Sequence, residues 1–212
     1  MKHDYYADEK DAAKWTVAFA ERGLEREGVV QVAMMPNLPI PAPPYHFDPM
    51  PGGTSPAVAQ FFQGERLLLL QGATPRDAAR IVGLAPSIVY LNPLPYLWAQ
   101  RAQYFAAVEN HLLQREARQR DVVLLDPCTG LSSFSQGPGD THLDSADITT
   151  VWGALRQGDV LMVFQYQLQG QYAGNWQHLA RGLLAGTLGL PLVGVRNCGL
   201  NGAVRFFCAT KP

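Results

Sequence analysis

The chain of 212 residues has few cysteines, few charges and no long apolar run, and each shortage excludes a class of protein. Its three cysteines, Cys128, Cys198 and Cys208, have no metal-ligand spacing, and an odd number argues against a disulfide framework. Charged residues make up 17% of the chain and the formal net charge is −1, so no global field attracts nucleic acid or an anionic membrane. No apolar stretch approaches a membrane span.

The amino terminus also lacks the apolar stretch of a signal peptide, and together with the cysteine count this predicts a cytoplasmic protein. The hydrophobic content of 47% is enough for one sizeable core. We therefore expect one domain over residues 1–212. The low proportion of charge favours either a large buried fraction or a homo-oligomer interface, and local basic patches leave nucleic acid possible as a partner.

Residues 36–56 contain eight prolines and two adjacent glycines, a composition that excludes regular structure. Long structureless loops in compact domains are usually functional, so this stretch predicts an ordered functional loop or a mobile lid. It contains His46, which is a candidate substrate-binding residue.

Strand-like and helix-like segments alternate along the rest of the chain. This order is typical of an α/β fold in three layers, with helices on both faces of a mostly parallel sheet. The turn signal Asn201-Gly202 predicts that the last two strands form an antiparallel hairpin. The seven expected strands are 29–35, 66–71 (an ambiguous one), 87–91, 121–126, 159–165, 192–196 and 203–209; the expected helices are 8–26, 57–63, 74–83, 97–118, 144–157 and 175–185.

The segment 121–131 is the most informative part of the chain. Four apolar residues lead into Asp126 and Pro127, a pattern that predicts a strand buried on both faces and ended by the proline. Asp126 is then left at the carboxyl end of a central strand, the edge where open α/β sheets bind ligands. Because a carboxylate is costly to desolvate, it usually has a partner or a chemical role. The alternative is that Asp126 only caps the turn at Thr129 and Gly130.

The order of elements resembles the class I (Rossmann-like) methyltransferases, whose parallel sheet ends in an antiparallel hairpin strand. In that family the fourth strand ends in an acidic motif, and the amino-methylating branch has Asp-Pro-Pro-Tyr there. The residues Asp126-Pro127-Cys128-Thr129 match its first two positions. The resemblance implies a seven-strand sheet, S-adenosylmethionine as cofactor, and an amine-bearing acceptor held by Asp126.

The segment Asp8-x-x-Asp11-x-x-Lys14-Trp15 carries a second, local resemblance. It is similar to the Asn-x-x-Asp-x-x-Lys-His opening of bacterial enzymes that methylate an adenine N6 in large-subunit ribosomal RNA. The chain is also similar to a set of uncharacterised bacterial proteins with a Tyr-x-Asp-x-x-Asp-x-x-Lys-Trp start, an Asp-Pro-x-Thr-Gly-Leu centre and a strand ending near a Tyr-Gln pair. The resemblance implies that Asp11, Lys14 and Trp15 bind the cofactor or an anion of the substrate.

Further candidates follow from the same sheet edge. Tyr166, at the end of the fifth expected strand, is a candidate catalytic residue that positions a ring, and Gln165 could recognise an amide. Pro127 and Thr129 are candidate substrate-binding residues beside Asp126. The predicted substrate is a small molecule or a nucleobase-like group. For Lys14 and Asp11, which lie three residues apart on one helical face, the alternative is an ordinary surface ion pair.

Three departures from the methyltransferase pattern favour a different function. One is Trp15, which stands where the ribosomal-RNA enzymes have His. The turn after the first strand, 35–39, has two prolines and no glycine, so it offers fewer backbone donors to a cofactor. The second expected strand ends in Gln71 rather than an acid. These departures support a non-catalytic binding or partner protein on the same fold.

A third possible function is a metal-dependent phosphoester hydrolase. Two His-x-Asp pairs, His46 with Asp48 and His142 with Asp144, could ligate a divalent metal together with Asp126. The alternative for Asp144 is a helix cap, and exposed loop histidines beside aspartates are common. We therefore assign no metal ligand from the sequence.

Overall fold

A computed structural model of the chain describes most of its residues. The helices are α1 (Glu9–Arg22), α2 (Pro56–Leu70), α3 (Arg101–Gln114), α4 (Ser145–Ala154) and α5 (Trp176–Leu188). The strands are β1 (Gly28–Ala33), β2 (Ile88–Leu91), β3 (Asp121–Asp126), β4 (Val160–Tyr166), β5 (Gly194–Arg196) and β6 (Val204–Thr210). The described residues are 8–23, 28–34, 47–71, 88–91 (backbone only), 100–116, 119–127, 130–131, 142–167, 173–200 and 204–212.

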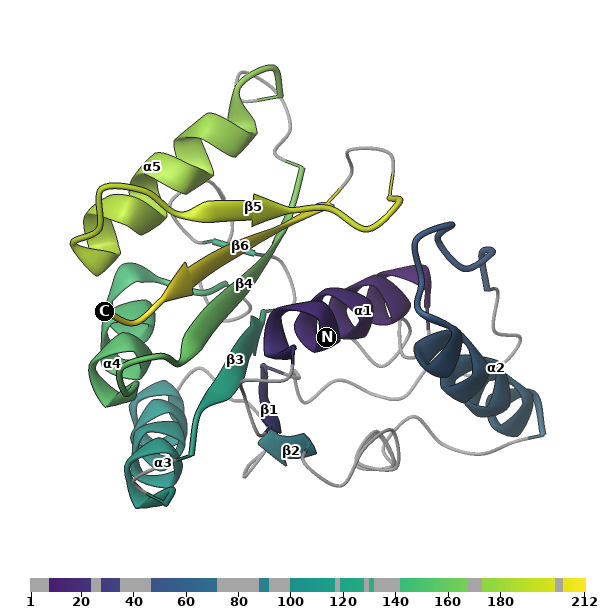
Figure 1. Ribbon diagram of the computed structural model, residues 1–212, viewed down its shortest axis with the longest axis horizontal. Coiled ribbons are helices and arrows are strands. Elements are labelled where there is room, and N and C mark those ends of the chain that lie inside the picture. Colours follow the sequence, from purple (N-terminus) through teal and green to yellow (C-terminus); the bar gives the residue numbers. More distant parts are fainter. Residues whose placement is uncertain are drawn as a thin grey trace.

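The described strands form one mixed sheet in the order β2-β1-β3-β4-β6-β5 (Figure 1). The pairs β1–β2, β1–β3 and β3–β4 are parallel, whereas β6 runs antiparallel to both of its neighbours, β4 and β5. The expected α/β class and carboxyl-terminal hairpin are therefore confirmed. Six strands are described rather than the expected seven, and the prediction that residues 1–212 form one domain stays a prediction.

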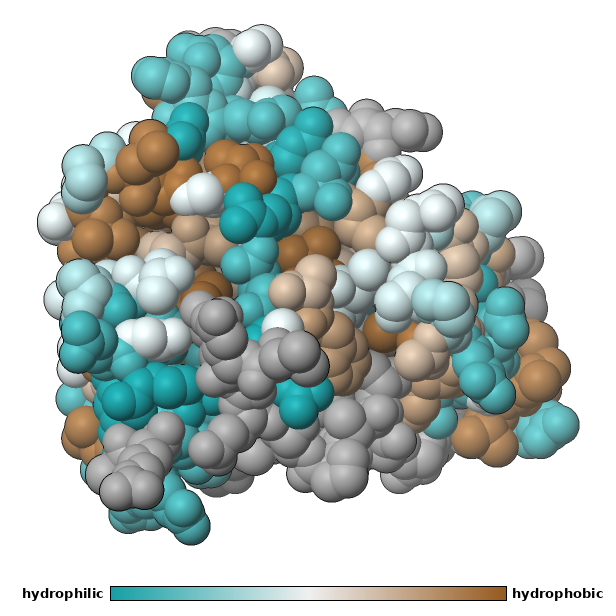
Figure 2. Space-filling view, in the orientation of Figure 1, coloured by the Kyte–Doolittle hydropathy of each residue, from teal (hydrophilic) through white to brown (hydrophobic). Residues whose placement is uncertain are grey.

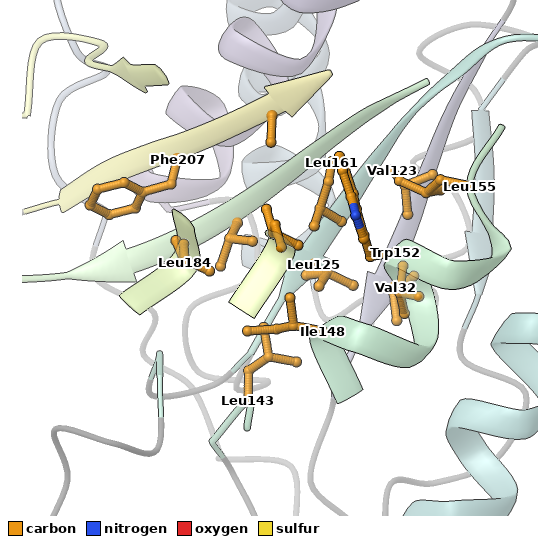
Figure 3. Packing of buried hydrophobic residues seen from close by; sticks show 14 of the residues in the cluster. Val32, Val123, Leu125, Leu143, Ile148, Trp152, Leu155, Leu161, Leu184 and Phe207 are labelled. Carbon is orange, nitrogen blue, oxygen red and sulfur yellow. The ribbon is translucent and has the colours of Figure 1, made fainter. Parts of the chain in front are cut away.

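Hydrophobic clusters cover both faces of the sheet and produce three layers. On one face, helices α3, α4 and α5 pack against β3, β4 and β6, and Figure 3 shows Ile148 and Trp152 of α4 beside Val123, Leu125 and Leu161. On the other face, α1 lies across β1, β3 and β4, and α2 packs against α1. Burying each large apolar side chain contributes roughly 1.5–3 kcal/mol relative to leaving it exposed.

Residues 66–70 correct one expectation, because they form the end of helix α2 and not a strand. The side chain of Ser55 accepts a hydrogen bond from the Val58 amide, and Pro56 occupies the first helical position. These two signals start a helix that continues through the leucine run. Figure 2 shows the brown surface that results at the end of α2, where three leucines are 41–62% exposed: Leu67, Leu68 and Leu70.

Helix α1 also ends earlier than expected. Gly23 has a φ of +54° and terminates the helix, four residues after Phe19, whose carbonyl accepts a hydrogen bond from the Gly23 amide, whereas the expected helix continued to residue 26. Asp144 caps α4 in a capping box with Asp147, as the cap alternative predicted. The expected helix over 74–83 and the Asn201-Gly202 turn lie outside the described residues. None of the described helices is long and apolar enough to cross a membrane.

Candidate functional site

Asp126 lies where the sequence places it, at the carboxyl end of β3 in the middle of the sheet. It pairs in register with Ala33, the last residue of β1, and its side chain is fully buried. Alternation along the strand puts Asp126 on the same face as Val122 and Leu124, which is the face that α1 covers. The carboxylate therefore lies beneath α1, at the edge of the sheet that parallel α/β folds use for ligands.

Two side chains contact the two oxygens of the Asp126 carboxylate. The ammonium of Lys14 is 2.8 Å from Oδ1, and Nε2 of Gln31 donates a 2.8 Å hydrogen bond to Oδ2. Lys14 also contacts Asp11 Oδ1 at 3.1 Å, and its Nζ lies 4.5 Å from the ring centroid of Phe164. These contacts join the first helix and three strands, β1, β3 and β4, in one buried polar cluster.

Both members of the central ion pair are charged at neutral pH. Burial raises the pKa of Asp126, but the nearby Lys14 and the hydrogen bond from Gln31 outweigh it and hold this pKa below its usual value. Burial also lowers the pKa of Lys14, and Asp126 and Asp11 raise it well above its usual range. Asp126 is therefore a weak base that can accept hydrogen bonds but does not readily take up a proton.

The sequence builds this cluster through the start of α1. The side chain of Asp8 caps the helix by accepting hydrogen bonds of 2.8 Å from the amides of Lys10 and Asp11. The i,i+3 spacing then places Asp11 and Lys14 on the face that meets the sheet. The expected alternative, a surface ion pair, is wrong because the Lys14 and Asp11 side chains are 4% and 1% exposed. The pKa of Asp8 is raised to about 7, mainly by burial and then by the negative charge of Asp11.

Tyr166 lies at the end of β4, near the same cluster. Its ring makes an edge contact with Phe164 at a centroid distance of 4.7 Å, and Lys10 Nζ lies 6.0 Å from its ring centroid. Burial raises the pKa of its phenol above the usual value, so the hydroxyl stays protonated at neutral pH. Tyr166 can therefore offer a ring surface and a neutral hydroxyl beside the edge of the sheet.

The side-chain amide of Gln165 forms hydrogen bonds with the protein backbone, including the backbone after β3. Its Oε1 accepts a 2.7 Å hydrogen bond from the Leu131 amide, and its Nε2 donates one of 2.7 Å to the carbonyl of Tyr166. Gly130 has a φ of +90°, and a Cβ there would come within 2.6 Å of Gln165 Oε1. In this arrangement Gln165 positions the segment that follows Asp126, and its role as a substrate-binding residue stays a prediction.

The remaining candidates are placed less directly. Trp15 is fully buried in the core with Phe19 beside it, and Pro127 is buried directly after β3. His46 and Thr129 lie outside the described residues. Within the described part of the chain, no group of three or more His, Cys, Asp or Glu side chains is placed to hold a metal ion.

Gln31 is a member of the cluster that the sequence analysis missed. It is the one polar side chain in the apolar run 29–35. A polar residue inside a buried strand was the sequence feature that could have identified it as a site residue. It is fully buried, and its Oε1 has no hydrogen-bond partner among the described residues. A buried acceptor without a partner is costly, so this atom suits an N–H donor from a bound molecule.

A second buried ionic cluster lies at the opposite edge of the sheet. Arg115 contacts Asp121, which begins β3, at 2.8 Å and Asp159, which precedes β4, at 2.7 Å. The Asp121 amide also donates a 2.9 Å hydrogen bond to Asp159. This cluster ties the end of α3 to the starts of two strands, which indicates a structural role.

No model of a known protein family matches the chain, and no curated protein does. Among solved structures, an O-methyltransferase family protein from Burkholderia thailandensis is similar, with a TM-score of 0.42 and 13% sequence identity. The match covers 93% of this chain but 54% of that protein, so the chain spans about half its length.

Proposed function

We propose that the chain is a divergent S-adenosylmethionine-dependent methyltransferase-like protein that acts on an amine-bearing substrate. The observation that supports this most is the strand order around Asp126. Four parallel strands are followed by β6, which enters antiparallel between β4 and β5, and Asp126 ends the strand at the centre. This is the arrangement implied by the resemblance to class I methyltransferases.

The charge of the buried cluster suits a cationic ligand. Asp11 and Asp126 place two carboxylates against the ammonium of Lys14. A sulfonium or an ammonium ion near the end of β3 would be attracted to these carboxylates, because water is largely excluded there. The unpartnered Gln31 Oε1 adds an acceptor for an N–H group. The cofactor, when bound, supplies an electrophilic methyl group.

The contacts assign different roles to the residues of the cluster. Asp126 and Gln31 accept hydrogen bonds from the amine and orient its lone pair. Lys14 fixes the Asp126 carboxylate and keeps it ionised. Because Asp126 is a weak base, we expect it to position the acceptor rather than to remove its proton. Tyr166 offers its ring to a planar substrate at the end of β4.

A specific observation favours the second candidate, a non-catalytic binding protein on the same fold. Both oxygens of Asp126 already have partners within the chain, Lys14 and Gln31, so a substrate amine must compete for them. In a non-catalytic binding protein, the same edge of the sheet would bind its ligand without catalysing a reaction.

The melting temperature in the presence of S-adenosylhomocysteine tests the proposal. At a concentration about 100 times the dissociation constant, the ligand should stabilise the protein by about 2.7 kcal/mol. For a chain of this size, we expect a rise of roughly 5–11 °C. No rise at millimolar ligand would exclude the methyltransferase assignment. If the temperature rises, Asp126→Asn should retain binding and lower methyl transfer, whereas binding without any transfer by the unaltered protein supports the second candidate.

A further inference from the structure

The carboxyl group of Asp8 is buried at the start of α1, one helical turn before Asp11. Its Oδ1 accepts hydrogen bonds from the amides of Lys10 and Asp11, so the helix cap uses a single oxygen of the carboxyl group. The other oxygen, Oδ2, is buried and has no hydrogen-bond partner among the described residues. A buried oxygen without a donor stabilises a carboxylate poorly, so this geometry favours the neutral, protonated form of Asp8.

Charged and titratable groups of three elements surround Asp8. Within α1 they are Glu9, Lys10, Asp11 and Lys14; α2 contributes Arg66, and β4 contributes Tyr166. Lys10 Nζ lies 3.6 Å from Asp8 Oδ2 and 3.2 Å from Glu9, so two carboxyl groups share this ammonium. Burial, followed by the negative charge of Asp11, outweighs the positive charge of Lys14 and raises the pKa of Asp8 to about 7. Asp8 therefore gains and loses a proton near neutral pH.

The cations and the phenol around Asp8 keep their protonation states near neutral pH. The pKa values of Lys10 and Lys14 are raised above that of an ordinary lysine, so both side chains stay charged. Burial lowers the pKa of Arg66, but a guanidinium does not lose its proton in proteins. Burial raises the pKa of the Tyr166 phenol, which stays neutral. A change of pH near 7 therefore alters the charge of Asp8 while these four groups stay as they are.

The charge of Asp8 acts on the candidate site through Lys14. Asp8 and Lys14 interact electrostatically, and the Lys14 ammonium contacts Asp126 at 2.8 Å. Because all three side chains are buried, water screens them weakly, and a change of one charge at Asp8 changes the potential around Asp126. We propose that Asp8 is a proton switch for this site: loss of its proton raises the affinity of the cluster around Asp126 for a cationic ligand, and uptake of the proton lowers it. The effect on ligand affinity rests on the proposed function.

The nitrogen-15 chemical shift of Lys14 Nζ, measured by nuclear magnetic resonance without any ligand, tests the switch itself. We expect this shift to change in a step near pH 7, because Lys14 senses the charge of Asp8. Asp8→Asn should remove the step and keep the helix cap. Asp144→Asn is the matched control, since Asp144 caps α4 on the other face of the sheet and its loss of charge should leave the step unchanged. Histidines also titrate in this range, so a step that persists in Asp8→Asn, or no step in the wild type, would overturn the proposal.

Calorimetric titration of two ligands over a range of pH tests the effect on binding. S-adenosylmethionine carries a sulfonium charge that S-adenosylhomocysteine lacks, so the ratio of their affinities reports the effect of ligand charge. From about pH 6 to about pH 8, we expect this ratio to rise by at least about threefold in the wild type relative to Asp8→Asn. An equal change of the ratio in both proteins would overturn the proposal. If neither ligand binds at any pH, the proposed function fails, and the Lys14 shift still decides whether Asp8 acts on the cluster.

Discussion

The ion pair between Lys14 and Asp126 is the central feature at the scale of single residues. Removing two charges from water costs more than their attraction usually returns, so a buried pair is weak evidence for a purely stabilising role. Here the pair also lies where the central strands end, beside a buried acceptor of Gln31. On the proposed function, the cluster is maintained for binding.

Substituting Lys14 tests how strongly the cluster depends on its ammonium. Lys14→Met leaves two buried carboxylates without their shared cation, and we expect the free energy of unfolding to fall by about 3–5 kcal/mol. Lys10→Met is the control, because its ion pairs are more exposed and should contribute less than about 1 kcal/mol. Urea denaturation measures both changes. Equal losses in the two variants would show that burial of the Lys14 cluster has no energetic consequence.

Asp8 gives the protein a predicted pH dependence. Its pKa is about 7 in the folded chain against 3.8 for an unperturbed aspartate, mainly because of burial and then because of Asp11. Between about pH 4 and pH 7 the folded state retains a proton that the unfolded state has released, so stability from this group falls as pH rises. Asp126, whose folded pKa is lowered, acts in the opposite sense and only below about pH 4.

Asp8→Asn should remove this slope while keeping the helix cap, since asparagine caps helices as well as aspartate does. The measurement is the free energy of unfolding of both proteins at intervals from pH 4 to pH 8. We expect the difference between them to change in favour of the variant as pH rises. A difference that stays constant over this range would contradict the raised pKa.

At the scale of elements, the backbone at residues 130–131 depends on the contact between Gly130 and Gln165. Gly130→Ala combines a positive φ with a Cβ only 2.6 Å from Gln165 Oε1. Gly189→Ala is the matched control, because Gly189 has a φ of +65° but open space around its Cβ. We expect about 1–2 kcal/mol of destabilisation in the control and distinctly more at Gly130. Thermal unfolding compares the two, and equal losses would exclude a tight contact with Gln165.

The elements also show where sequence patterns succeed and fail. Strand β3 was predictable to the residue, because an apolar run meets a proline that cannot continue the ladder. The leucine run 67–70 was mistaken for a strand because a short apolar run fits either structure. The deciding signals, Ser55 as cap and Pro56 at the first position, lie 12 and 11 residues before Leu67. The leucine run could be recognised as helical only by following the chain from the start of α2, Pro56, to its end, Leu70.

At the scale of the whole molecule, two buried ionic clusters lie at opposite edges of the sheet. The Arg115 cluster joins strand starts, and the Lys14 cluster lies where strands end. We expect Arg115→Met to destabilise the fold by about 3–5 kcal/mol, because the buried Asp121 and Asp159 would lose their shared cation. The affinity of the folded variant for S-adenosylhomocysteine, measured by calorimetry at low temperature, should stay within about twofold of wild type. A large loss of affinity would show that the edge where the strands start also contributes to ligand binding.

The candidate site was only partly predictable from the sequence. The position of Asp126 followed from local pattern, whereas its ion pair with Lys14 was not predicted. The contact with Gln31 depends on the pairing of β1 with β3, residues that are about 95 apart in the chain. No local pattern specifies such a pairing, so the partner of Asp126 emerged only from the fold.

Hydrogen–deuterium exchange of the protein with and without S-adenosylhomocysteine tests the central claim most directly, since it shows where the ligand binds. We predict slower exchange in peptides that cover the start of α1, the end of β1 and the chain around Asp126. Peptides that cover Arg115, Asp121 and Asp159 at the opposite edge should exchange at unchanged rates. Protection confined to that opposite edge, or no protection anywhere at millimolar ligand, would contradict the account.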